Sequence, residues 1–462
     1  MLFNSFSFLL IFFPLVLGVS IRLRGLPLIR WITLASLIFY SYAGQRWFVI
    51  PMLFTTTLDF YLAQFMERVG HLHSKRRKTI MVFSLCGNLG LLFLFKYSGL
   101  FSETFQLLFH GSLKGLVALG LPAGISFYTF QTMSYMIDVF RGECVAEKSF
   151  WKFACFVSFF PHLIAGPLTR HNQLIPQLDR IEAEGVRPQW SSGVYLFAVG
   201  LTKKVLVADR IGNLVDPLIL DMSKLTSLTG WLALIGYSMQ IYFDFSGYSD
   251  MAIGLGRLFG IELPQNFNSP YKALNPSDFW RRWHITLSRW LKDYLYISLG
   301  GNRCGPLRKN LNLLITMALG GFWHGANWTF IGWGLFHGMI LILYHQMQST
   351  WDSFHKYIQR GVTFLLICFG WVFFRSPTFN DAYIWFKKLT FLDGVGANFL
   401  NSETLTLGAF CILGLIIVNF FKNASSENWS QVSDGRQFAW GVATLAALIF
   451  MNYSSKFLYY QF

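Results

Sequence analysis

Long stretches without charged residues alternate with short polar connections along this chain. The runs with little or no charge fall at about 1–21, 31–45, 47–58, 79–95, 115–137, 188–202, 225–243, 310–351, 361–374, 404–421 and 437–455. A bilayer crossing needs about 20 apolar residues, so the run 310–351 is long enough for two. The pattern predicts an all-α, multi-spanning membrane protein in one domain, 1–462, with roughly eleven transmembrane helices plus re-entrant or interfacial helices.

Composition agrees with a membrane protein. Hydrophobic residues make up 53% of the chain and charged residues only 13%, whereas a soluble domain usually has about a quarter of its residues charged. The net charge of +15 suits cytoplasmic loops that face membrane lipids or a phosphorylated substrate, and we expect no nucleic acid partner. The six cysteines show no C-x-x-C spacing and indicate neither a disulfide framework nor a metal site.

The first charges predict the orientation of the chain. Residues 1–21 carry none, and Arg22, Arg24 and Arg30 follow the apolar run. Because a cleavable signal has its basic residues before the apolar run, this segment is predicted to be a retained span. The positive-inside rule places its N-terminus outside and the first loop in the cytoplasm.

One uncharged stretch, GGFWHGANW at 320–328, carries a titratable side chain at its centre, His324. An imidazole within lipid must find a polar partner or a water-filled cavity. The small residues allow close approach to the backbone, and Trp323 and Trp328 can form flat walls. The stretch is typical of a reaction channel. The residues alone equally allow a proton-relay histidine in a transporter, although no internal repeat is present.

The polar segment 262–310 predicts an amphipathic helix. Asn275, Pro276 and Asp278 form a helix start, and at helical spacing one face carries Trp283, Leu287, Trp290 and Tyr294. His284 falls within this helix. The basic residues are interpreted as a mouth for a phosphorylated substrate, since guanidinium groups bind two oxygens at once; they are Arg281, Arg282, Lys292 and Arg303. The alternative is a helix that only anchors the chain at the membrane surface.

Other polar residues in apolar surroundings have simpler explanations. Pro161 and Pro167 exclude a single regular helix across 159–170, and His162 within it is interpreted as a satisfied structural histidine. Asp244 and Asp250 lie in an apolar segment. We interpret these two carboxylates as a polar clamp between helices in preference to channel-lining groups, because acids within a membrane usually pair.

These motifs resemble the membrane-bound O-acyltransferase family, in its bacterial alginate and cell-wall O-acetylation branch. The strongest similarity lies in SPYKALNPSDFWRRWHITLSRWLKDYLYISLGGNR (269–303) and GGFWHGANW (320–328). Support comes from 159–170, 244–261, 371–379 and the stretch FLYYQF at 457–462.

The resemblance implies a funnel-like helical fold with a central tunnel, in the inner membrane of a bacterium. It implies that His324 is the central catalytic histidine and His284 a second one. The donor would be cytoplasmic acetyl-CoA, with no permanently bound cofactor. The acetyl group would pass to a periplasmic esterase-like acetyltransferase partner and on to an exported polysaccharide. D-alanyl transfer from a carrier-protein thioester to a cell-wall polymer is the alternative within the family.

Acyl transfer to a hydroxyl needs a general base and a group that stabilises the oxyanion. Neutral imidazole suits the first role, which we expect of His324. Tryptophan N–H groups, Asn327 or backbone N–H groups near Gly321 and Gly325 suit the second, and Trp323 and Asn327 are expected to line the tunnel. Since no cysteine lies near His324, the commonest thioester nucleophile is missing. Direct transfer and a covalent acyl-enzyme both stay open.

Overall fold

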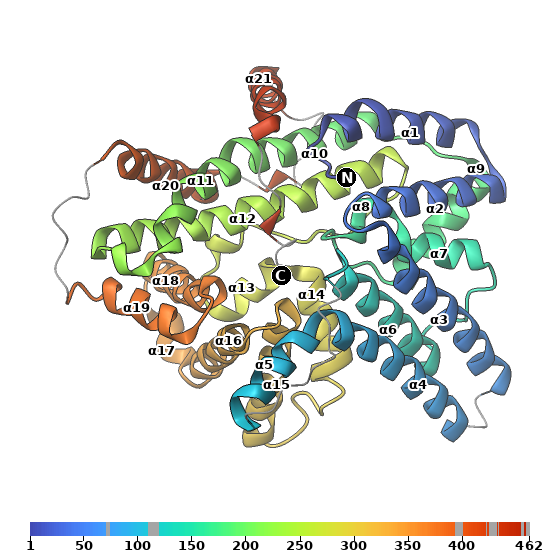
Figure 1. Cartoon of the computed structure of the whole chain (residues 1–462), viewed down its shortest axis with the longest axis horizontal. Coiled ribbons are helices and arrows are strands. Elements are labelled where there is room, and N and C mark those ends of the chain that lie inside the picture. The colour runs from blue at the N-terminus through green and yellow to red at the C-terminus, as the bar shows by residue number, and fades with distance from the viewer. Residues whose placement is uncertain are drawn as a thin grey trace. The chain divides into compact units, whose positions relative to one another are not determined.

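The computed structural model describes residues 1–70, 74–109, 120–392, 401–421, 423–424, 432, 434–453 and 457–458 (Figure 1). Helices form all the regular structure in these ranges, and no strand occurs there. Helices satisfy every backbone hydrogen bond within one segment, which lipid requires. The all-α prediction is confirmed. The beginning of the expected run 115–137 and most of the motif 457–462 lie outside the described residues.

Several described helices are long and apolar enough to cross a membrane. Five meet both criteria: Arg46–Val69, Ser74–Gln106, Trp190–Leu220, Lys356–Arg375 and Ser402–Phe420. Two shorter apolar helices, Ser7–Arg22 and Gly25–Ser41, precede them. The protein is therefore a multi-pass membrane protein. Our count of roughly eleven spans and the orientation of the N-terminus stay predictions.

The chain forms two compact units, 1–198 with 249–264 and 199–248 with 265–462. The single domain 1–462 stays a prediction. The first unit contains α1 (Phe13–Arg22), α2 (Gly25–Ser41), α3 (Val49–Val69), α4 (Ser74–Leu92), α5 (Ser98–Phe109), α6 (Ile125–Arg141), α7 (Phe150–Ser158), α8 (Phe160–Leu163) and α9 (His171–Glu184). Two helices, α10 (Trp190–Thr202) and α12 (Ser227–Leu258), run across the division.

The second unit contains the remaining helices. These are α11 (Asp209–Leu220), α13 (Pro276–Arg282), α14 (Ile285–Trp290), α15 (Pro306–His324), α16 (Trp328–Gln346), α17 (Gln348–Ser353), α18 (Lys356–Arg375), α19 (Phe379–Leu389), α20 (Ser402–Phe420) and α21 (Asp434–Phe450). Short π-helical segments at Lys203–Ala208 and Leu291–Tyr296 directly follow α10 and the short α14. The run 310–351 thus forms two long helices, α15 and α16, and the start of the short α17. Neither long helix is among the five candidate spans, so two crossings from this run stay a prediction.

The first unit has an aromatic core at its N-terminal end. Phe3, Phe8, Phe12, Phe39 and Phe160 are all less than 9% exposed. The ring of Phe160 lies 5.4 Å from that of Phe39 and 5.5 Å from that of Phe12, centroid to centroid. Tilted and edge-on aromatic pairs at such distances add about 0.5–1.5 kcal/mol beyond burial. The N-terminal residues are therefore packed firmly into this unit.

The segment 159–170 breaks where its prolines predicted. Helix α7 ends at Ser158, α8 covers only four residues, and α9 begins at His171. His162 is 2% exposed, and its Nε2 lies 3.0 Å from the amide nitrogen of Gln131. This contact satisfies one ring nitrogen, whereas Nδ1 is buried without a hydrogen-bond partner in the described part of the chain. The structural role of His162 stays a prediction.

A buried ion cluster joins distant parts of the second unit. The ammonium of Lys204 lies 2.8 Å from Asp209 and 2.5 Å from Asp244, with all three side chains at most 3% exposed. The ring of Phe457 lies 4.6 Å from the same ammonium, and the backbone N–H of Leu458 donates to Asp244 over 3.0 Å. The clamp interpretation of Asp244 is thus confirmed. Buried charges require such partners.

Helices α15 and α16 pack against each other through glycines (Figure 1). A Cβ atom at Gly321 would collide with the backbone carbonyl oxygen of Phe330, and one at Gly334 with that of Met317. The close approach that we expected at Gly321 is therefore made by the neighbouring helix. Small residues bring membrane helices together in this way.

We expect Gly321→Ala to destabilise the protein by about 1–3 kcal/mol, the usual cost of overpacking. Gly361→Ala in α18 is the matched control, because a Cβ there meets open space. Alanine should stabilise that helix by up to about 1 kcal/mol. Thermal unfolding in detergent measures both changes. A shift of the same sign and size in the two variants would contradict the close packing of α15 on α16.

Candidate active site

His324 is the last residue of α15, directly before the break that separates α15 from α16. Gly325 is extended after it, with φ −162° and ψ 153°. A Cβ at Gly325 would collide with the ring of Phe330, so only glycine fits this turn without a shift. The sequence HGANW therefore ends one helix and starts the next, and it fixes His324 at a helix end.

Aromatic side chains surround His324. Its ring centroid lies 5.0 Å from that of Trp323, 5.1 Å from that of Trp333 and 5.3 Å from that of Phe374. All three rings stand edge-on to the imidazole, and His324 itself is 4% exposed. Packing of this kind fixes the orientation of the imidazole.

His324 lines a cavity of about 430 Å³ within the second unit, a volume typical of small-molecule sites. The apolar walls come mainly from α15, α16 and the segment 287–291, and polar groups are interspersed among them. The lining residues are Ser277, Trp280, Arg281, Leu287, Ser288, Leu291, Lys292, Tyr296, Asn302, Leu313, Thr316, Met317, Gly320, His324, Trp333, Leu341 and His345.

Two of the four predicted basic residues line this cavity. Arg281 and Lys292 are exposed side chains at its wall, whereas His324 is buried. Arg282 instead forms an ion pair with Asp278, its Nε 3.0 Å from the carboxylate. Arg303 is exposed and does not belong to the lining residues. The cavity thus joins exposed positive charge to a buried imidazole.

The helix predicted across 276–294 is interrupted at His284. Asn275 caps its start as expected, with its side chain accepting from the N–H of Asp278 over 2.7 Å. However, α13 ends at Arg282, Trp283 is extended, and His284 has φ 41° and ψ 53° before α14 begins. The prediction of one continuous helix was therefore wrong. Its apolar face was placed correctly, because Trp283, Leu287, Trp290 and Tyr294 are all buried.

The break brings His284 beside His324. The two imidazole centroids lie 6.5 Å apart, and the ring of Trp323 lies 6.1 Å from His284. Phe245 packs edge-on against His284 at 4.8 Å. His284 is 1% exposed. A left-handed backbone at a non-glycine residue costs about 1–3 kcal/mol and often marks a functional position.

The other predicted tunnel residues have different surroundings. Trp323 is 4% exposed and packs against both histidines without lining the cavity. Asn327 caps α16: its oxygen accepts from the N–H of Thr329 over 3.0 Å, and its amide donates to the carbonyl of Pro377 over 2.7 Å. Trp328 is 49% exposed and does not belong to the residues that line the cavity.

Sequence reasoning missed the walls that the structure shows. Trp280 and Trp333 line the cavity with their rings 5.7 Å apart. Both indole nitrogens are buried and have no hydrogen-bond partner within the described part of the chain. No spacing signal marks these two residues, since one lies on the expected amphipathic helix and the other in a uniformly apolar run.

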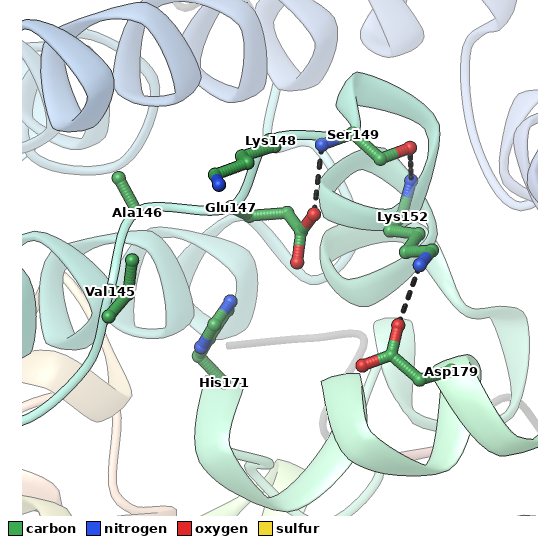
Figure 2. A pocket seen from close by; sticks show the side chains of 8 residues that line it. All are labelled: Val145, Ala146, Glu147, Lys148, Ser149, Lys152, His171 and Asp179. Carbon is green, nitrogen blue, oxygen red and sulfur yellow. Dashed lines mark hydrogen bonds and ion pairs between the residues drawn. The ribbon is translucent and has the colours of Figure 1, made fainter.

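A second pocket, of about 570 Å³, lies in the first unit, and Figure 2 shows the side chains around it. Lys152 lies 2.6 Å from both Asp179 and Glu182. The carboxylate of Glu147 accepts a backbone N–H over 2.8 Å. Burial lowers the pKa of His171 to about 4, so this ring is neutral at pH 7. The charges around the pocket largely compensate one another, and we assign it no part in the chemistry.

Comparison with known proteins identifies the family. The family model of MBOAT, membrane-bound O-acyltransferase family, matches residues 37–377. The chain is 36% identical to a peptidoglycan O-acetyltransferase of Helicobacter pylori, over 94% of this chain and 91% of the relative. It is also 36% identical to the probable alginate O-acetylase AlgI of Pseudomonas aeruginosa, over 91% and 81%. A teichoic acid D-alanyltransferase of Bacillus subtilis is 26% identical over 56% and 69%.

The chain therefore belongs to the membrane-bound O-acyltransferase family and is a membrane-embedded acyltransferase. Membership excludes the transporter interpretation that the residues alone left open.

Proposed function

We propose that this protein transfers an acetyl group from acetyl-CoA to the hydroxyl of an exported polysaccharide of the peptidoglycan or alginate type. The observation that carries the proposal is the cavity that joins Arg281 and Lys292 to His324. CoA carries several phosphates, which guanidinium and ammonium groups bind. The names of the relatives, two of which are O-acetylating enzymes, support acetyl as the acyl group.

In the proposed reaction His324 acts as general base. It takes the proton of the acceptor hydroxyl as that oxygen attacks the thioester carbonyl. The tetrahedral intermediate then collapses, the C–S bond breaks, and the proton passes from the imidazole to the leaving thiolate of CoA. Direct transfer of this kind yields one acetyl ester and one CoA thiol. A positioned base contributes about 10²- to 10⁴-fold.

The oxyanion of the intermediate needs a hydrogen-bond donor near His324. We assign this role to the indole N–H of Trp333. Trp333 lines the cavity, its ring lies 5.1 Å from that of His324, and its buried N–H has no hydrogen-bond partner in the described ranges. A buried donor without a partner is uncommon in native proteins. Asn327, whose amide caps α16 and holds Pro377, is assigned a structural role instead.

Transfer from radiolabelled acetyl-CoA tests the proposal. Purified protein in detergent is incubated with the donor and a peptidoglycan or alginate oligosaccharide, with and without a periplasmic esterase-like partner. We expect label in the oligosaccharide. Label from a D-alanyl carrier-protein thioester but not from acetyl-CoA would contradict the proposal and favour D-alanyl transfer. A less similar relative is named as a teichoic acid D-alanyltransferase.

Replacing both cavity cations separates donor binding from turnover. In Arg281→Gln/Lys292→Gln we expect the KM for acetyl-CoA to rise about 10- to 100-fold, which corresponds to about 1.4–2.7 kcal/mol for the two contacts together. This is less than two fully formed charge-assisted hydrogen bonds would give, because both side chains are exposed and screened by water. The value of kcat should change much less, because the phosphates bind equally in ground and transition states. Arg308→Gln is the control, an exposed arginine that does not line the cavity. An unchanged KM in the double variant would mean that the two cations do not hold the donor.

A further inference from the structure

One residue, Asn266, holds the strained turn at His284. Its backbone oxygen accepts the N–H of Ile285 over 2.9 Å. Its side-chain oxygen accepts the N–H of Thr286 over 3.3 Å and the hydroxyl of Thr286 over 2.9 Å. Asn266 is fully buried, at 0% exposed. These bonds compensate for the left-handed backbone, which is costly for any residue except glycine.

The same contacts identify the proton on His284. A backbone N–H can only donate, so the Asn266 atom that faces the N–H of Thr286 is the carbonyl oxygen and not the amide nitrogen. That oxygen also lies 3.1 Å from Nδ1 of His284. Because an amide oxygen can only accept, Nδ1 must carry a hydrogen.

The other ring nitrogen is then an acceptor. Burial lowers the pKa of His284 to about 3, so the ring is neutral at pH 7. A neutral imidazole has a single N–H, and its second nitrogen carries a lone pair. With the hydrogen on Nδ1, the lone pair is on Nε2. A group that reaches Nε2 must donate to it.

We propose that Asn266 is a positioning residue for acyl transfer, which holds His284 in the Nδ1–H tautomer so that Nε2 accepts a hydrogen bond or proton beside His324. The inference rests on the proposed function. It makes His284 an acceptor next to the catalytic imidazole, 6.5 Å from it centroid to centroid, although His284 itself does not line the cavity. It also excludes His284, in its neutral form, as a donor to the oxyanion through Nε2.

The tautomer can be observed without any activity assay. The chain has ten histidines, each with two ring nitrogens, and in protein labelled with ¹⁵N-histidine the pair of ring signals lost in His284→Gln belongs to His284. We expect the ¹⁵N shifts of a neutral ring protonated at Nδ1, and a proton on Nδ1 that exchanges slowly because the ring is buried. Protonation at Nε2 in the wild-type protein would overturn the assignment.

Kinetics of two variants test the positioning role. Asn266→Leu removes the acceptor, and we expect kcat to fall about 10- to 100-fold, the range seen when partners that orient a histidine are removed. The KM for acetyl-CoA should stay within about twofold. Asn266→Asp keeps an acceptor oxygen at the same place, and at pH 8 it should regain most of the lost kcat. Failure of Asn266→Asp to exceed Asn266→Leu would overturn the positioning role.

Asn423→Leu is the matched control. This buried amide donates to the carbonyl of Phe267 over 2.8 Å, next to Asn266 in the chain, so its removal tests packing of the same segment. We expect its kcat to stay within about twofold of wild type. A fall equal to that of Asn266→Leu would assign the effect to general loss of packing. Absence of acetyl transfer in the wild type would contradict the proposed function, whereas the NMR result would stand.

Discussion

His324→Ala is expected to insert and fold normally. Its rate of acetyl transfer should fall about 10²- to 10⁴-fold, the usual contribution of a positioned general base. The side chain lies at a helix end, so its removal leaves the backbone of α15 intact. It is 4% exposed and lines the cavity with the two cations. Removal should therefore affect the chemical step more than donor binding.

Two measurements test this expectation. Transfer from radiolabelled acetyl-CoA gives the rate, and binding of acetyl-CoA by calorimetry should stay within a fewfold of wild type. The control is His355→Ala, an exposed histidine outside the cavity, which should retain full activity. Transfer by His324→Ala at the wild-type rate would exclude this residue as the base.

Lys204→Met is expected to cause the largest loss of stability, about 3–5 kcal/mol, because it leaves the carboxylates of Asp209 and Asp244 buried without their cation. Both lie within 2.8 Å of the ammonium. The residue does not line the cavity, so any loss of activity should follow the loss of folded protein.

The control for Lys204 is a surface pair in the same unit. Lys224 lies 3.0 Å from Asp221, but the two side chains are 83% and 45% exposed. Such pairs contribute at most about 1 kcal/mol, so Lys224→Met should unfold nearly as the wild type does. Thermal unfolding in detergent compares the two. Equal stability of the two variants would show that the buried cluster does not hold the unit together.

Local signals in the sequence predicted several elements correctly. The cap at Asn275, the proline break in 159–170 and the break between α15 and α16 all depend on residues within a few positions of the feature. Hydropathy predicted the helical class for the same reason, since lipid restricts the backbone to helices.

The break at His284 could not be predicted in this way. Trp283 to Tyr294 has a continuous amphipathic pattern, and the interruption depends on hydrogen bonds from Asn266, 18 residues earlier in the chain. The different roles of two neighbouring arginines could have been predicted. Arg282 pairs with Asp278 four residues earlier on the same helix, a contact that helical spacing allows, whereas Arg281 lines the cavity; we had given both the same role.

The cluster around Lys204 also affects how the chain is made. Asp244 and Leu458 are 214 residues apart, and a ribosome adds about 5–20 residues per second. For roughly 10 to 40 s of synthesis, Lys204 and the two carboxylates must therefore wait in the membrane without the backbone donor and the Phe457 ring that later cover them. Substitutions at Phe457 or Leu458 should therefore lower the amount of folded protein without a direct effect on the reaction, because neither residue lines the cavity.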